Sequence, residues 1–377
     1  MKKKNLLLTA MFSSLAIVTT VSAQETEAAA EKADSVEVAK RGELTISGSA
    51  DVYYRYDILG EKASNNMTSF TNSHNTFELG MASATIDYQF KTVGVTLDLG
   101  FGKRANEFSY NETASGSPVL SAIKQAYLYY QPADWVKITA GSWGTHVGYE
   151  LLDPQLNANY STSYMFSNGP FFHTGLKAEF FKGAHSIMIG IANPNDFKFN
   201  APRLKYGLFQ YAVEVNPHLS IYLNYAGGQP ASKQLTNQID LVLFSQVSDK
   251  VGLGFNGTVN IASDLAAKTD QAWHGQALYV NYAPKEWASL NLRLEHFGDP
   301  KQLTVLSSAA AGGSVYEATL SANFKTHGVT LIPEFRFDSS SEKIFTLKDG
   351  TASQHSASFT IAAIYNFSIS PKLRKKH

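Results

Sequence analysis

The sequence predicts an all-β fold, namely a transmembrane antiparallel up-and-down β-barrel of about 16 strands whose long third external loop folds into the lumen. Three observations predict it. Long runs of residues alternate between apolar and polar, which is the period of a strand. These runs last about 9–13 residues, the length that a tilted strand needs to cross a bilayer, rather than the usual 5–6. The connections between the runs are alternately short and long.

The N-terminus has the pattern of a secretory signal peptide, assigned to residues 1–23. Residues 2–4 are lysines, residues 6–21 are mostly apolar, and residues 21–23 (VSA) suit a cleavage site. The apolar run is shorter than the ~20 residues of a membrane span, so an anchoring helix is the weaker interpretation. Residues 24–43 form a polar linker. The chain has no Cys, which excludes a lipoprotein and a disulfide framework, and we expect the mature chain to be exported.

The first strand illustrates the alternation. One face is apolar or aromatic and carries Leu44, Ile46, Ala50, Val52, Tyr54 and Tyr56. The opposite face is mostly polar and carries Thr45, Ser47, Ser49, Asp51, Tyr53, Arg55 and Asp57. The pattern returns at residues 93–101, 290–295, 316–325, 331–338 and 359–367. A soluble sandwich also alternates, but here aromatic residues gather at strand ends, where the interfacial girdles of a membrane barrel lie.

The connections set the number of strands. Short ones with turn residues occur at 91–92, 132–134, 182–183, 216–218, 248–250, 283–286 and 326–328. Long ones, rich in Ser, Asn, Gly and Ala, occur near 58–76, 103–122, 146–172, 194–203, 228–236, 262–272, 298–314 and 339–354. Seven short and eight long connections make fifteen, hence about sixteen strands between residues 44 and 369, with both chain ends in the periplasm. Residues 370–377 are a basic tail.

Some strands alternate less cleanly. In residues 77–90 the apolar phase switches between Met81 and Ala84, which predicts either a β-bulge or apolar side chains in the lumen. Residues 124–131 and 273–282 leave both faces mixed. We therefore expect the count of sixteen strands to hold to within about two.

A barrel of this size implies a pore. About eight strands leave an interior that side chains fill, whereas about sixteen leave an aqueous channel. The candidate pore-lining residues are the inward charged side chains Asp51, Arg55, Asp98, Asp240, Arg293, Glu295, Glu334 and Arg336. Charges of both signs either need water or pair with one another across strands, and their mixture predicts no ion selectivity. The expected partners are outer-membrane lipid and small hydrophilic solutes.

The third long connection, residues 146–172, is aromatic and rich in Ser and Asn. Folded into the lumen, it would narrow a pore that is otherwise wide. Its aromatic residues would then pack on the wall and its polar groups would face water. The candidate residues of this constriction loop are Glu150, Tyr160, Ser161 and Ser163. A loop folded over the rim of the barrel is the alternative.

The same region carries a family resemblance. The runs GSWGT (141–145), GYE (148–150), NYSTS (159–163) and GPFFHTG (169–175) resemble the motifs of the OmpL-like β-barrel porins of Gram-negative bacteria. The resemblance implies an outer-membrane porin that passes small solutes, with passive diffusion as its activity. Many outer-membrane barrels end on an aromatic residue, whereas a basic tail follows the last strand here.

Other functions have weaker support in the sequence. A substrate-specific uptake channel and a surface adhesion barrel are the alternatives, and an outer-membrane lipid hydrolase is a more distant one. We expect no enzyme, cofactor or metal site, because no G-x-S-x-G, H-E-x-x-H, EF-hand or phosphate-loop motif occurs. Thr145, His146 and His173 are interpreted as packing residues. The zero net charge gives no reason to expect a nucleic-acid partner. The choice between a monomer and a homotrimer stays open.

Overall fold

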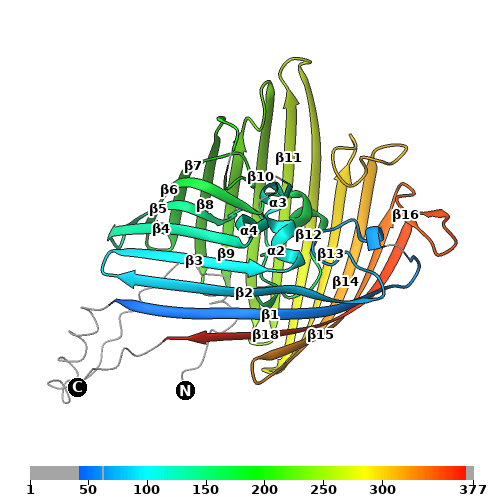
Figure 1. Ribbon diagram of the computed structural model, residues 1–377, viewed down its shortest axis with the longest axis horizontal. Coiled ribbons are helices and arrows are strands. Elements are labelled where there is room, and N and C mark those ends of the chain that lie inside the picture. Colours follow the sequence, from blue (N-terminus) through cyan, green and yellow to red (C-terminus); the bar gives the residue numbers. More distant parts are fainter. Residues whose placement is uncertain (1–41, 62, 115, 117, 200, 371–377) are drawn as a thin grey trace.

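The computed structural model describes residues 42–61, 63–114, 116, 118–199 and 201–370. The predicted signal peptide, nearly all of the linker and all but the first residue of the tail lie outside these residues. Sixteen strands form a closed antiparallel barrel in which each strand pairs with its neighbours in sequence (Figure 1). The barrel closes where β1 (Glu43–Asp57) pairs with β18 (His355–Ile369). The predicted all-β up-and-down barrel and its strand count are confirmed, and the position of the third long connection stays a prediction.

The remaining barrel strands follow the chain. They are β2 (Thr76–Phe90), β3 (Val93–Phe101), β4 (Ile123–Ala133), β5 (Val136–Gly144), β6 (Phe172–Lys182), β7 (His185–Ala192), β8 (Tyr206–Asn216), β9 (Leu219–Gly228), β10 (Gln234–Ser248), β11 (Val251–Asp264), β12 (Thr269–Lys285), β13 (Ala288–Asp299), β14 (Gly313–Thr326) and β15 (Val329–Ser340). A separate small hairpin consists of β16 (Phe345–Thr346) and β17 (Ala352–Ser353).

The wall is apolar outside and polar inside. In β14 the side chains of Tyr316 and Leu320 are 60% and 51% exposed, whereas those of Glu317 and Thr319 between them are 3% and 0% exposed. A soluble protein has the opposite arrangement, because apolar surface is costly in water and buried charge is costly in a dry core. The outer face therefore suits hydrocarbon, and the closed barrel pairs each strand with two neighbours, so that it has no open sheet edge there.

The predicted irregularity in β2 is a bulge. Asp51 of β1 pairs with Met81 and the next residue, Val52, pairs with Leu79, so Gly80 is the extra residue. The bulge switches the phase of the strand just before Met81, whose side chain is fully buried on the inward face. Both consequences expected from the sequence, a bulge and an apolar inward residue, thus occur together.

The seven short connections occur where turn residues predicted them, but two connections predicted as long have only four and five residues. The segment predicted as 262–272 is only 265–268, and the segment predicted as 228–236 is only 229–233. The reason is that β10, β11 and β12 have 15, 14 and 17 residues, more than the membrane needs, and so extend past their neighbours (Figure 1).

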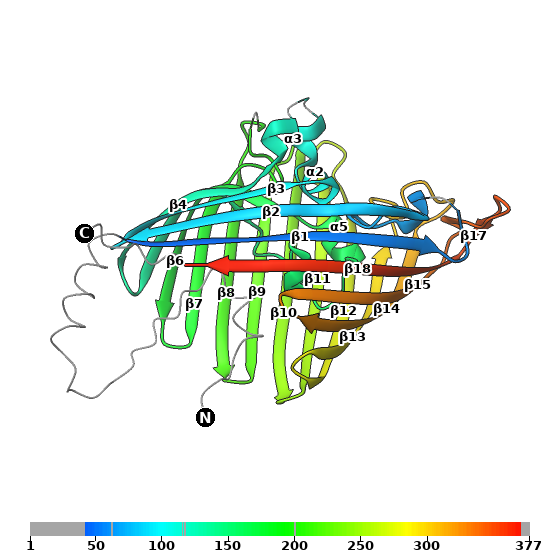
Figure 2. The same cartoon turned by 60° about the horizontal axis from the view of Figure 1, so that its bottom comes forward.

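Short helices occupy three of the other long connections. The segment between β3 and β4 contains α2 (Lys103–Phe108), α3 (Tyr110–Ala114) and α4 (Pro118–Ser121). The segment between β5 and β6 contains η2 (Pro154–Leu156) and α5 (Tyr164–Asn168), and η1 (Ala63–Asn66) follows β1. Among the described residues, no helix has the length and hydrophobicity of a membrane span. Figure 2 shows α5 behind β1 and β2, between them and the strands of the opposite wall.

Candidate functional site

Residues 145–171, here named the β5–β6 segment, have little regular secondary structure. Their backbone N–H and C=O groups therefore need partners other than a helix or a ladder. Most of the interior charges that the sequence singled out supply these partners. The site is a set of contacts between the segment and the inward face of the wall.

Two wall carboxylates each accept hydrogen bonds from two consecutive backbone N–H groups. Glu334 accepts from Tyr160, at 2.7 Å, and from Ser161, at 3.1 Å. Glu295 accepts from both residues 164–165, at 2.7 and 2.8 Å. Pairs of successive N–H groups directed at one anion form a strong, charge-assisted contact. The carboxylates fix the path of the segment along β13 and β15.

Arg293 on β13 lies at the centre of this network. It donates to Glu150 at 2.6 Å, to the Ser161 carbonyl at 2.7 Å and to Glu317 of β14 at 2.9 Å. Glu150 in turn accepts from the N–H and the hydroxyl of Ser163, at 2.8 and 2.7 Å. Ser163 also caps α5, because its hydroxyl accepts the Phe166 N–H. The guanidinium thus joins the wall to both halves of the segment.

Arg336 on β15 forms a parallel contact. It donates to the Thr162 carbonyl at 2.7 Å and to Asp338 at 2.8 Å. The same carboxylate accepts the hydroxyl of Tyr164, at 2.8 Å. The guanidinium carbon also lies 5.0 Å from the centre of the Tyr164 ring, within the range of a cation–π contact.

Tyr160 reaches across to β1, where its hydroxyl donates to Asp51 at 2.5 Å. Gly80, the bulged residue of β2, makes room for this contact. A Cβ at Gly80 would lie 1.8 Å from the Asp51 carboxylate and 2.8 Å from the tyrosine oxygen. Because Gly80 has no side chain, the bulge leaves space for the buried hydrogen bond between Tyr160 and Asp51.

The opposite side of the segment packs against β10, β11 and β12. The Tyr149 ring lies between those of Phe244 and Tyr279, with centroids 4.6 and 3.9 Å away. Gly254 of β11 lies beneath it, and a Cβ there would come within 2.4 Å of the Tyr149 ring. An absent side chain thus creates the space that Tyr149 occupies. No feature of the sequence pattern indicates that Gly254 and Tyr149 meet.

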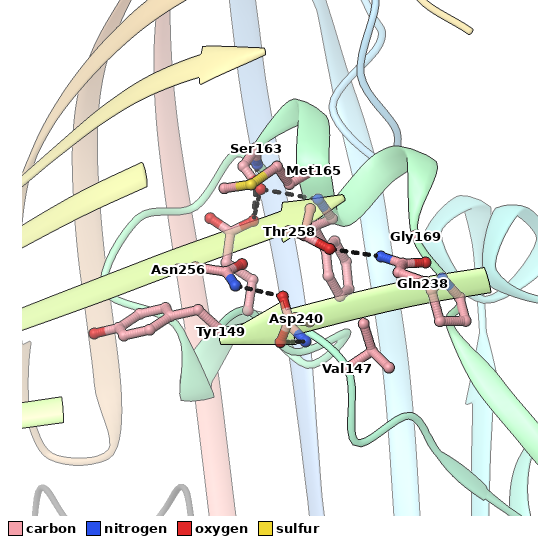
Figure 3. Close-up of a pocket in the computed structure, with 13 residues that line it drawn as sticks. Val147, Tyr149, Ser163, Met165, Gly169, Gln238, Asp240, Asn256 and Thr258 are labelled. Carbon is pink, nitrogen blue, oxygen red and sulfur yellow. Dashed lines mark hydrogen bonds between the residues drawn. The ribbon is translucent and has the colours of Figure 1, made fainter. Parts of the chain in front are cut away.

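A narrow gap remains beside this contact (Figure 3). Asp240 of β10 accepts from the Gly148 N–H at 3.0 Å, from Asn224 at 2.8 Å and from Asn256 at 2.6 Å. The gap is lined also by Gln238 and has a volume of about 10 Å³. That is room for about one water molecule.

The structure brings together most of the predicted site residues. Six of the eight predicted wall residues bond the β5–β6 segment, namely Asp51, Asp240, Arg293, Glu295, Glu334 and Arg336. The other two bond elsewhere: Arg55 donates to the Ser73 carbonyl at 2.7 Å, and Asp98 pairs with Lys124 at 3.1 Å. All eight are at most 3% exposed. Lys124, which sequence reasoning did not single out, also pairs with Asp153 of the segment, at 2.6 Å.

Outside the membrane strands, a buried acid holds the end of the segment. Asp196 accepts from the N–H groups of Phe171 and Phe172, at 2.7 and 3.0 Å, and from the Tyr110 hydroxyl at 3.2 Å. Burial raises the pKa of Asp196 to about 6, although these hydrogen bonds oppose the shift. Burial likewise lowers the pKa of Lys198 to about 8.

Two histidines of this region, His146 and His173, pack against each other. His173 shares a hydrogen bond with Thr145 at 3.0 Å, and its ring centre lies 5.2 Å from that of His146. Burial lowers the pKa of His146 to about 4, so the ring is neutral at pH 7. No carboxylate contacts either ring among the described residues, and no group of three or more potential metal ligands occurs there.

A closed barrel of sixteen strands with an apolar outer face and a charged, loop-contacted inner face defines an outer-membrane porin. The chain belongs to the family described as "Putative beta-barrel porin-2, OmpL-like", whose model matches residues 43–367. The protein is therefore a porin of the bacterial outer membrane. No curated protein matches the sequence.

Solved structures of outer-membrane proteins share the fold at low sequence identity. The trimer form of OmpT, an outer membrane protein of Vibrio cholerae, has a TM-score of 0.60 and 10% identity over 86% of this chain and 99% of its own. The anion-selective porin from Comamonas acidovorans has a TM-score of 0.56 and 10% identity, covering 87% and 100%. The outer membrane channel DcaP of Acinetobacter baumannii has a TM-score of 0.55 and 11% identity, covering 86% and 97%. At these identities the likeness concerns the fold alone.

Proposed function

We propose that the β5–β6 segment is the constriction of this porin and that small hydrophilic solutes diffuse past it. One observation carries the proposal. The backbone of a segment without regular structure is bonded to buried charges on the inward faces of β10, β13 and β15. A loop folded over the rim would reach only the outer ends of these strands, whereas Glu295 and Glu334 lie within them.

The proposed role of the wall charges is to hold the segment. Arg293 and Arg336 are 0% and 2% exposed, and segment carbonyls and carboxylates occupy their guanidinium groups. A buried charge is costly unless it is paired and hydrogen-bonded, and these are both. Arg293 and Arg336 line the pore only in the sense that their side chains face the interior of the barrel. Their effect on a passing ion is indirect, through the position of the segment.

The proposed path follows the β10–β11 side. Above the 10 Å³ gap lies an open hollow of about 650 Å³, and the two share Gly169, Pro170 and Gln238. The wall side chains at the gap are mostly amides and hydroxyls, which suit water and uncharged polar solutes. A small displacement of the segment at Gly148 or Gly169 would widen this passage.

Single-channel conductance in a planar bilayer tests the constriction. We expect stable ohmic steps from the intact protein and larger steps when residues 157–169 are deleted. Deletion of residues 349–351, an exposed tip between β16 and β17, is the matched control and should leave the steps unchanged. Equal steps from both deletions would place the constriction elsewhere. No conductance from the intact protein would contradict diffusion through the barrel and favour an adhesive role.

We also propose that the protein has no enzymatic activity. The neutral histidine pair without a carboxylate supports this, and so does the porin family. Incubation of the purified protein with phospholipid vesicles should release no fatty acid. Release that disappears in His173→Ala would overturn the proposal and favour the lipid hydrolase.

We propose a homotrimer as the assembly. Strands β3–β9 have 8–11 residues, and β7 has the fewest, with 8. A strand of this length tilted by 45° covers roughly 19 Å, less than the apolar band of ~25 Å, so this low wall suits contact with another copy. Ile189→Lys on β7 should yield monomers in sedimentation of the detergent-solubilised protein, whereas Leu253→Lys on β11 should not. Trimers in both variants would exclude this wall as the contact.

A further inference from the structure

The open hollow on the side of the long connections is a separate feature of the barrel. It is bounded by the segments that follow β1, β3, β5 and β7 and by the ends of β10 and β11. Its volume of about 650 Å³ is large enough for a small organic solute. Its lining residues are Ser69, Asn72, Glu107, Tyr110, Ser167, Asn168, Gly169, Pro170, Phe171, Asn195, Asp196, Gln238 and Asn260.

The lining is rich in hydrogen-bond acceptors. Asn168 must turn its NH₂ group to the Tyr164 carbonyl, at 2.8 Å, because a carbonyl only accepts. Asn260 likewise donates to Gln238, at 3.2 Å. The amide oxygens of Asn168 and Asn260 receive no hydrogen bond from the described part of the chain. These oxygens can therefore accept from a solute.

The charges of the hollow have one sign. Glu107 accepts from the Phe70 N–H at 2.6 Å and from the Asn72 amide at 3.1 Å, and each of its oxygens keeps a free lone pair. Asp196 is the second carboxylate, and no Lys or Arg is among the lining residues. Lys103 lies in the adjoining hollow, where it donates to the Asn72 carbonyl at 3.4 Å.

We propose that this hollow is a binding site for a small solute that carries an ammonium group and several hydroxyl donors, such as an amino sugar. Such a solute would meet Glu107 with its cation and the Asn168 and Asn260 oxygens with its hydroxyls. An anion of equal size would face the two carboxylates, and no Lys or Arg is among the lining residues to balance them. The inference rests on the proposed function, because it makes the hollow the entry site for solutes that then pass the constriction.

Three sugars of one ring size and different charge test the site: glucosamine, glucose and glucuronate. Each is added at pH 7 to one side and then to the other of a bilayer that holds the full-length protein, and the block of the KCl current is measured. We expect half-maximal block by glucosamine from the side of the long connections at a concentration about threefold to tenfold below that of glucose, because a partly exposed ion pair contributes little more. Glucuronate should block least.

Glu107→Gln is the decisive variant. The amide oxygen of the glutamine can still accept from the Phe70 N–H. The Asn72 side chain can turn so that its amide oxygen accepts from the NH₂ group of the glutamine. We therefore expect the fold to persist. Heat-modified migration of the barrel in electrophoresis checks this. The variant should lose the preference for glucosamine over glucose. Asp264 is an exposed acid at the last position of β11, where it accepts hydrogen bonds in the turn. Asp264→Asn removes the same charge and should keep the preference for glucosamine over glucose.

The outcomes separate this proposal from the proposed function. Equal block by all three sugars, stronger block by glucuronate, or a preference that survives Glu107→Gln would overturn the binding site while leaving the porin intact. If the protein gave no KCl current, the proposed function, diffusion of solutes through the barrel, would be wrong. Calorimetric titration of the detergent-solubilised protein with the same sugars would then decide the binding site by itself.

Discussion

Replacement of Glu334 tests the statement that wall carboxylates hold the β5–β6 segment. In the wild type one carboxylate oxygen accepts from the Tyr160 N–H and the Ser321 hydroxyl, both at 2.7 Å, and the other accepts from the Ser161 N–H at 3.1 Å. In Glu334→Gln the amide oxygen can serve the first position. The NH₂ group of the glutamine then faces the Ser161 N–H. Both groups are donors, so the Ser161 N–H loses this acceptor.

The expected cost follows from the number of donors left without a partner. A buried N–H without an acceptor costs about 1–3 kcal/mol, so Glu334→Gln should lower the free energy of unfolding by about that amount. Glu334→Ala leaves two N–H groups unpaired and should cost about 2–6 kcal/mol. If the segment detaches from the wall, its N–H groups can bond to water. Detachment therefore sets an upper limit on the loss of free energy of unfolding in both variants.

Urea unfolding of the protein in lipid vesicles, followed by tryptophan fluorescence, measures these differences. Glu78→Gln is the control, since that half-buried carboxylate accepts a hydrogen bond only from the Thr76 hydroxyl within the described part of the chain. It should change the free energy of unfolding by less than about 0.5 kcal/mol. The same samples in a bilayer should show more current noise for the Glu334 variants. If Glu334→Gln matched the control in both experiments, the carboxylate would not hold the segment.

Three further predictions concern other contacts of the segment. Gly254→Val should displace the Tyr149 ring, lose stacking worth about 1–3 kcal/mol and raise the single-channel conductance, whereas unchanged conductance would contradict a role for this contact in narrowing the passage. Arg293→Met leaves Glu150 and its neighbours without their cation, and should lower the free energy of unfolding by about 3–5 kcal/mol; a neutral result in urea unfolding would refute this. Asp196 has a pKa raised to about 6, so the folded state keeps its proton longer than the unfolded state, and the free energy of unfolding falls as the pH rises from about 4 to about 6. Asp196→Asn should remove about 3 kcal/mol of this pH dependence, and parallel pH curves for the two proteins would exclude the assignment.

The sequence by itself determined the barrel. The period of two in strands such as residues 316–325 and the Gly, Pro, Asn and Asp residues of the short connections are local properties of the chain. A strand that is apolar on one face and charged on the other has a favourable environment for both faces only between hydrocarbon and an aqueous or polar interior. Counting turns then sets the strand number. The lengths of the connections near residues 228–236 and 262–272 were wrong, because alternation continues past the membrane without a marker of where the lipid ends.

Only the tertiary structure decided what the interior charges bind. Glu334 and Tyr160 are 174 residues apart, and Arg293 and Glu150 are 143 residues apart. Their contacts depend on where barrel closure places each strand and on the path of the β5–β6 segment, neither of which the pattern of one strand contains. The alternation predicts that Arg293 points inward, but not whether it meets water or a carbonyl. Gly254 shows the limit most clearly, since the space for Tyr149 is created by a side chain that is absent.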